Sequence, residues 1–107
     1  MLKHLAYSGI TSLLLLPARI SCFAQNSTAD IYQSKCQMCH AADGSGNTPA
    51  GKTMKARPFN SPDVLKESDT DLTAVIKKGK NKMPAFEGKL TEAQIATLVA
   101  HIHTLQK

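Results

Sequence analysis

The sequence predicts an all-α fold in which three to four helices form one small domain. Three segments, residues 27–36, 68–79 and 91–105, begin with residues at the spacing of a helix N-cap, and the last two continue with apolar residues at helical spacing. No segment has the alternating, β-branched character of a strand. A domain of this length has a small core, so we expect the protein alone to fold poorly without an additional apolar group.

Residues 1–24 are predicted to be an export signal. A short polar start that contains Lys3 is followed by an apolar stretch from residue 5 to residue 16. That stretch is shorter than the ~20 apolar residues needed to cross a bilayer, so no permanent membrane anchor is expected. Small residues near Ala24 suit cleavage after that position. The domain, residues 25–107, is then predicted to be periplasmic.

Removal of the signal lowers the charge of the chain. The full sequence has a formal net charge of +5, but Lys3 and Arg19 leave with the signal, so 11 basic residues remain against 8 acidic ones, a charge of +3. The basic residues are not interleaved with aromatic ones, and the signal directs export. Nucleic-acid binding is therefore not expected.

The first helix is predicted to begin near Ser27 and to run into Cys36. Ser27 and Asp30 have the spacing of a capping box. Ile31 and Tyr32 are expected to face the interior.

The segment Cys36-Gln37-Met38-Cys39-His40 is the pattern by which haem is attached covalently to protein. Two thiols one helical turn apart can each add to one vinyl group of a haem, which leaves the imidazole of the next residue under the iron. The motif predicts thioether links at Cys36 and Cys39 and a proximal iron ligand at His40. The implied cofactor is one haem c.

Cysteines at this spacing also form redox-active disulfides or half of a zinc site. A thioredoxin-like dithiol belongs to a βαβ setting, and no strand is predicted here. A structural zinc site needs two further ligands, for which the domain offers only His101 and His103, far along the chain. The sequence favours haem and keeps the dithiol and the zinc site as alternatives.

Residues 41–60 are rich in Gly, Pro, Lys and Asn with little periodicity, which predicts an extended loop over the cofactor. Lys52, Lys55 and Arg57 are candidates to neutralise the haem propionates, and solvated loop charges are the equal alternative. Phe59 is expected to pack on the haem or under the loop.

A short helical turn is predicted from Ser61 to Lys66, opened by a proline. A longer helix follows, because Ser68 and Asp71 have capping spacing. It ends at Gly79 with lysines in its last turn. Its apolar stripe is Leu72, Val75 and Ile76.

The segment Lys82-Met83-Pro84-Ala85-Phe86 offers a second iron ligand. Met83 lies 43 residues after His40, and a thioether on the other face of the iron favours the reduced state. Phe86 is expected to help keep water off the iron. The rivals for this position are Met54, His101 and His103.

The last helix is predicted to begin at Thr91, which forms a capping box with Gln94. One face of this helix is apolar and consists of Ile95, Leu98, Val99, Ile102 and Leu105.

Taken together, these motifs resemble the small bacterial class I cytochromes c. The motifs that carry the resemblance are CQMCH followed by AADGSGNTP, then KGKNKMPAF, and then LTEAQIATLVAHIHTL, and together they cover residues 28–105. The resemblance implies a cytochrome c fold wrapped around one covalently attached haem, with electron transfer as the activity.

The family pattern also implies roles for single residues. In the family the first helix crosses the last one, with a Gly eight residues and an aromatic residue four residues before the first haem cysteine; here Thr28 and Tyr32 stand at these positions. His101 takes a place at the crossing where the family has Tyr or Trp. Leu98 is expected to pack towards the haem, and a carbonyl near Pro49 is expected to accept the second ring N–H of the proximal histidine.

If protein ligands fill both axial positions of the iron, no site is left open for a substrate. The sequence therefore predicts a one-electron carrier and not an enzyme. Lysines around Met83 could steer acidic redox partners to the haem edge, or form a solvated surface; they are Lys77, Lys78, Lys80, Lys82 and Lys89. The alternatives are a haem subunit of a larger periplasmic oxidoreductase and a ligand-binding haem sensor or enzyme.

Overall fold

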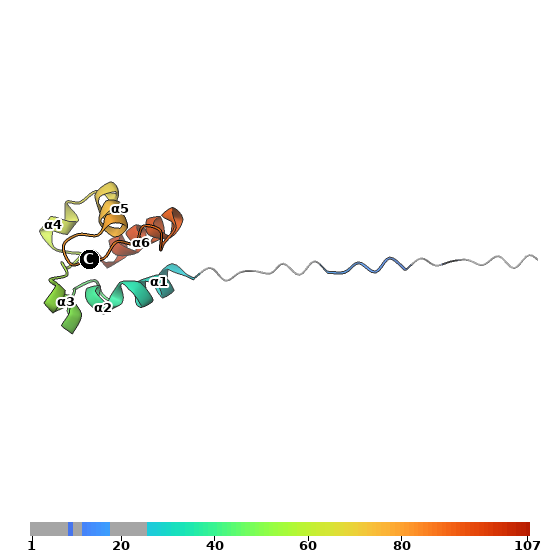
Figure 1. Ribbon diagram of the computed structural model, residues 1–107, viewed down its shortest axis with the longest axis horizontal. Helices are drawn as coiled ribbons and strands as arrows, with labels where there is room; N and C mark the ends of the chain where they lie inside the picture. The colour runs from blue at the N-terminus through green and yellow to red at the C-terminus, as the bar shows by residue number, and fades with distance from the viewer. Residues whose placement is uncertain (1–8, 10–11, 18–25) are drawn as a thin grey trace, which may run out of the picture.

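The computed structural model describes residue 9, residues 12–17 and residues 26–107 (Figure 1). The predicted cleavage position after Ala24 lies outside these residues, as does most of the predicted signal. Residues 12–17 have no regular secondary structure. Within the described part of the chain, no helix has the length and apolar character required to span a membrane.

Residues 26–107 contain six helices and, apart from them, only isolated β-bridges. The all-α prediction is confirmed. The number of helices exceeds the predicted three to four because two short helices flank the loop after residue 40. The helices are α1 (Thr28–Lys35), α2 (Gln37–His40), α3 (Pro49–Met54), α4 (Pro62–Leu65), α5 (Asp69–Lys78) and α6 (Glu92–Leu105).

The predicted N-caps are present. The Ser27 hydroxyl accepts a hydrogen bond from the Asp30 N–H at 3.2 Å and begins α1. Ser68 and Thr91 begin α5 and α6 with complete capping boxes, in which side chain and backbone bond reciprocally. These caps satisfy N–H groups that the helices themselves leave free, so the sequence fixes where three of the helices start.

Helix α3 lies inside the segment that the sequence predicts as an extended loop, so that prediction is wrong for Pro49–Met54. The Thr48 hydroxyl accepts from the Gly51 N–H at 2.8 Å and Pro49 takes the first helical position. The helix has no apolar stripe that would reveal it in the sequence. Gly51 is buried because α3 packs closely on α2, and a Cβ at this position would overlap the carbonyl oxygens of Cys39 and Gly46.

Helix α6 forms the centre of the core, packed against α1 and α5 (Figure 1). Ile95, Leu98 and Val99 are almost fully buried. At the contact with α1, the rings of Tyr32 and His101 lie 4.6 Å apart, tilted by 54°. This contact confirms the expected crossing of the first and last helices, with an imidazole on one side.

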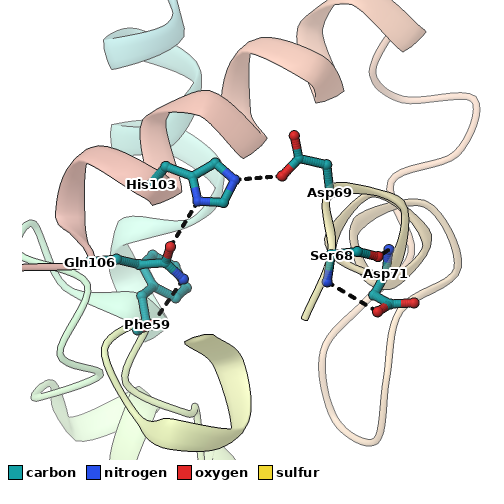
Figure 2. A network of polar contacts seen from close by, with 6 residues as sticks. All are labelled: Phe59, Ser68, Asp69, Asp71, His103 and Gln106. Carbon is teal, nitrogen blue, oxygen red and sulfur yellow. Dashed lines mark hydrogen bonds and ion pairs between the residues drawn. The ribbon is translucent and has the colours of Figure 1, made fainter. Parts of the chain in front are cut away.

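A polar network joins the end of α6 to the start of α5 and to the loop that carries Phe59 (Figure 2). The Nε2 atom of His103 lies 2.5 Å from an Asp69 carboxylate oxygen, and its Nδ1 lies 2.8 Å from Oε1 of Gln106. The Gln106 amide donates to the Phe59 carbonyl oxygen at 3.1 Å. Hydrogen bonds to Asp69 and Gln106 raise the pKa of His103, because both ring nitrogens can donate only in the protonated ring.

Candidate cofactor site

A cavity of about 450 Å³ lies between the helices. This is within the range of small-molecule and cofactor sites. Most of its lining is apolar, and segments far apart in the chain supply it. The lining that bears on chemistry and packing consists of Cys36, Cys39, His40, Met54, Phe59, Val64, Leu72, Ile76, Met83, Phe86, Leu98 and Ile102.

Cys36, Cys39 and His40 are held by one short helical turn. The N–H groups of Cys39 and His40 both donate to the Cys36 carbonyl oxygen, at 3.2 and 2.9 Å. Cys36 itself ends α1, since its N–H donates to the Tyr32 carbonyl oxygen. The two thiols and the imidazole therefore reach the same cavity through local backbone structure.

The raised pKa of Cys36 argues against a redox-active dithiol. Burial raises the pKa of Cys36 to about 11, whereas catalytic dithiols need a thiol with a lowered pKa. Zinc finds no support in the described residues, which contain no group of three or more His, Cys, Asp or Glu side chains arranged to hold a metal ion. Both thiols line the same cavity.

His40 is suited to bind a metal ion of a bound cofactor. Burial, followed by the positive charge of Arg57, lowers the pKa of His40, which favours the neutral imidazole that ligates metals. Its ring stacks on Phe59, with centroids 4.8 Å apart and planes 28° apart. Phe59 is thus buried against the proximal residue.

The expected hydrogen bond between His40 and a carbonyl near Pro49 is not present in the described structure. Nδ1 of His40 is buried without a hydrogen-bond partner. Pro49 opens α3, so its carbonyl oxygen points along that helix and accepts from the Thr53 hydroxyl at 3.0 Å. The imidazole thus retains an unsatisfied nitrogen beside the cavity.

Two long-range hydrogen bonds fix the turn after His40. The Tyr32 hydroxyl donates to the Ala41 carbonyl oxygen at 2.6 Å, and burial raises the pKa of Tyr32 to about 12, so it remains a donor. The Thr48 hydroxyl donates to the Met38 carbonyl oxygen at 2.6 Å. These bonds join α1 and the cap of α3 to the motif.

Met83 reaches the cavity on a short turn after α5. Lys80 and Met83 exchange two backbone hydrogen bonds, of 2.9 and 3.3 Å, and form an isolated bridge. Gly79 precedes the turn with φ of +73°, and a Cβ there would lie 2.5 Å from the Met83 carbonyl oxygen. The Phe86 N–H donates to the Ile76 carbonyl oxygen at 3.0 Å and fastens the far end of the turn to α5.

The predicted rivals of Met83 differ in position. His101 and His103 are not among the residues that line the cavity; the first contacts Tyr32 and the second Asp69. Met54 lines the cavity but is 43% exposed, whereas Met83 packs against the core. Phe86 and Leu98 line the cavity as expected.

Comparisons with known proteins agree with this geometry. A family model described as cytochrome c oxidase, cbb3-type, subunit III matches residues 24–102. Cytochrome c6 of a Synechococcus species is 33% identical over 99 residues, which covers 87% of this chain and 79% of the relative. The chain belongs to the class I cytochromes c.

Further relatives support the assignment. Cytochrome c6 of a Nostoc species is 32% identical to this cytochrome over 102 residues, which covers 87% of this chain and 89% of the relative. A solved structure, the KustC0563 c-type cytochrome, matches with a TM-score of 0.69 and 28% identity, and the match covers 77% of this chain and all of that one. This cytochrome carries one covalently attached haem c and transfers electrons to and from other proteins; it is not an enzyme.

The residues of the cavity fit a haem. Two thiols, an imidazole and a thioether line one mostly apolar space. Of the residues predicted to meet the propionates, Lys55 and Arg57 line the cavity and Lys52 does not.

The lysines around Met83 differ in their position relative to the cavity. Lys80 and Lys82 line the cavity mouth, whereas Lys77 forms an ion pair with Glu92 at 2.7 Å and so is not available as a free rim charge. Two charged lining residues were missed in the sequence, Lys35 and Glu67. Lys35 could have been found from its place beside the motif, but nothing in the sequence around Glu67 marks it.

Proposed function

We propose that this cytochrome is a periplasmic one-electron carrier whose haem is linked to Cys36 and Cys39 and ligated by His40 and Met83. The observation that carries the proposal is that all four side chains line one mostly apolar cavity, although they come from two separate segments of the chain. When bound, haem supplies the Fe(III)/Fe(II) couple.

The residues of the chain have distinct tasks. His40 offers a neutral nitrogen donor, and the Met83 thioether favours the reduced state. Phe59 and Phe86 are buried and limit the access of water. If His40 and Met83 both hold the metal of the bound haem, the protein would leave no position open to a substrate, and the group would serve electron exchange.

Electron exchange is proposed to occur beside the attachment motif. Met38, between the two thiols, is 74% exposed, so a partner can approach this edge closely. Lys35, Lys80 and Lys82 give the mouth of the cavity positive charge, which suits acidic partners and predicts association rates that fall with ionic strength. The periplasmic location is supported by the export pattern of residues 1–24.

A haem subunit of a larger periplasmic oxidoreductase is a second candidate. It is favoured by the description of the matching family model, which names an oxidase subunit. Purification of the native protein distinguishes the two, since a subunit elutes with a large complex and a carrier elutes at the size of the single domain.

The ligand assignment is tested by absorption spectra of the wild type, Met83→Ala and Met54→Ala, with a denaturing gel stained for haem. We expect all three to keep haem on the gel. Met83→Ala is expected to lose the weak far-red band of Met-ligated ferric iron and to bind carbon monoxide rapidly, while the matched control Met54→Ala keeps the band. A native spectrum in Met83→Ala would contradict the distal assignment.

The same spectra and the same gel test the proximal side. His40→Ala is expected to abolish a stable low-spin protein, because no other imidazole of the described residues lines the cavity. Absence of haem from the wild-type band would contradict covalent attachment.

A further inference from the structure

Glu67 lies just after α4, in the wall of the cavity, and is the only acidic residue of the described chain that lines it. Its side chain is 17% exposed. One carboxylate oxygen, Oε1, accepts a hydrogen bond from Nη2 of Arg57 at 3.0 Å. The other, Oε2, is buried and has no hydrogen-bond partner among the described residues.

The two partners of this ion pair do not meet solvent equally. The Arg57 side chain is 36% exposed, about twice the exposed fraction of Glu67. Water therefore screens the guanidinium more than the carboxylate, and Arg57 donates a hydrogen bond to only one of the two carboxylate oxygens. Glu67 thus contributes the one acidic charge of the described cavity wall, which Arg57 in the same wall offsets in part.

Retention of such a group has a cost. A carboxylate oxygen buried without a donor loses its hydration without compensation. The feature is explained if the charge acts on the group that the cavity holds.

We propose that the Glu67 carboxylate lowers the reduction potential of the haem. The proposal rests on the proposed function in one respect, that this cavity is the haem site. Reduction adds one electron to the iron, which goes from Fe(III) to Fe(II), and no bond to Glu67 forms or breaks. A nearby negative charge stabilises the more positive ferric site, and the weakly polar cavity increases this effect. The effect of Glu67 on the reduction potential is thus opposite to that of Met83, whose thioether raises the potential. The positive charge of Arg57 reduces the effect of Glu67.

The test is the midpoint potential of the purified holoprotein, measured by optical redox titration at pH 7. Glu67→Gln removes the charge and keeps the shape and an oxygen that can accept from Arg57. The matched control is Glu92→Gln, which removes the same charge from an exposed ion pair, since Glu92 is 74% exposed and does not line the cavity.

We expect Glu67→Gln to raise the equilibrium constant for reduction by roughly threefold to tenfold; tenfold corresponds to about 59 mV for a one-electron couple. Glu92→Gln is expected to change it by less than about twofold, because exposed charges are screened. Arg57→Gln, which leaves Glu67 without its partner, is expected to lower the potential.

The sign of the shift separates charge from structural damage. A loosened cavity admits water, which favours the ferric state and lowers the potential, whereas loss of the Glu67 charge raises it. An unchanged or lowered potential in Glu67→Gln with an intact low-spin spectrum would overturn the proposal. If Glu67→Gln does not retain haem, the double variant Arg57→Gln/Glu67→Gln is compared with Arg57→Gln, and a potential that is not higher in the double variant would overturn the proposal.

Failure of the proposed function and failure of the Glu67 proposal give different experimental results. A wild-type protein whose spectrum lacks the His/Met bands would contradict the ligand assignment before any variant is measured. A normal wild-type spectrum with no effect of Glu67→Gln would contradict only the role of Glu67.

Discussion

The two segments that supply the proposed iron ligands are built in different ways. Cys36 to His40 are placed by successive helical hydrogen bonds within α1 and α2. Met83 is placed by one two-bond bridge and by the attachment of Phe86 to α5. The segment from Cys36 to His40, here called the attachment side, is therefore largely a local structure. The turn that carries Met83, here called the Met83 side, depends on α5 being in place.

Each side also depends on one glycine, for different reasons. Gly51 leaves room for the carbonyl oxygens of Cys39 and Gly46, so that α3 can pack on the motif. Gly79 has φ of +73° and ψ of 172°, a conformation open almost only to glycine. A similar backbone angle occurs directly after the attachment side, at Ala41 (φ 62°, ψ 165°), where a Cβ is accommodated; at Gly79 the angle is combined with a carbonyl oxygen 2.5 Å from where a Cβ would lie.

Replacement of Gly51 is expected to have the largest effect. In Gly51→Ala the new methyl group meets two backbone oxygens that cannot move aside, so α3 must separate from the motif. We expect a loss of about 3 kcal/mol in the free energy of unfolding, the upper end of the usual range for overpacking, measured by guanidinium denaturation of the holoprotein, and a reduced yield of haem-stained protein. A variant as stable as the wild type would show that α3 does not support the attachment side.

Replacement of Gly79 is expected to act on the Met83 side alone. Gly79→Ala adds backbone strain of roughly 1–3 kcal/mol and pushes on the Met83 carbonyl oxygen. The far-red band is expected to weaken while haem remains attached. Gly88→Ala is the matched control, because Gly88 has φ of +79° and open space at its Cβ; an equal loss of the band in both variants would attribute the effect to strain and not to contact with Met83.

The smallest expected effect concerns pH. The pKa of His103 is raised by its hydrogen bonds to Asp69 and Gln106, so its contribution to stability is complete below its unfolded pKa of about 6.5 and is lost as the pH rises through the higher folded value. Because the pair is exposed, we expect only a few tenths of a kcal/mol.

This effect is measured as the difference in denaturation midpoint between wild type and His103→Gln, from pH 5 to pH 9. The higher denaturation midpoint of the wild type should disappear at high pH. A difference that stays constant across this range would show that His103 acts by packing.

The sequence predicts best the features that are encoded locally. Ser68 with Asp71 and Thr91 with Gln94 form the capping boxes that their spacing predicts. The attachment motif is equally local, and it predicted three residues that the structure places together at the cavity. Tyr32 and His101 were paired only through the family pattern.

Features that depend on tertiary packing were harder to predict. Helix α3 has polar residues and a central glycine, so neither periodicity nor propensity marks it, and only Thr48-Pro49 signals its start. Because Pro49 opens α3, its carbonyl oxygen points along that helix and does not accept the hydrogen bond that was expected from His40. Glu67 lines the cavity because α4 and the following turn fold against it, which no local pattern encodes.

The distance in sequence between the two sides has a consequence for folding kinetics. Once haem is attached at the motif, an unfolded chain can offer the iron Met54, only 14 residues beyond His40, as well as Met83 at 43 residues. The shorter loop costs about 1 kcal/mol less entropy to close, so we expect the nearer sulfur to be sampled first. If Met83 is the ligand in the folded protein, formation of the Lys80–Met83 bridge and of the Phe86 hydrogen bond to α5 would replace the nearer sulfur by the farther one. The final ligand exchange thereby reports when α5 reaches its place.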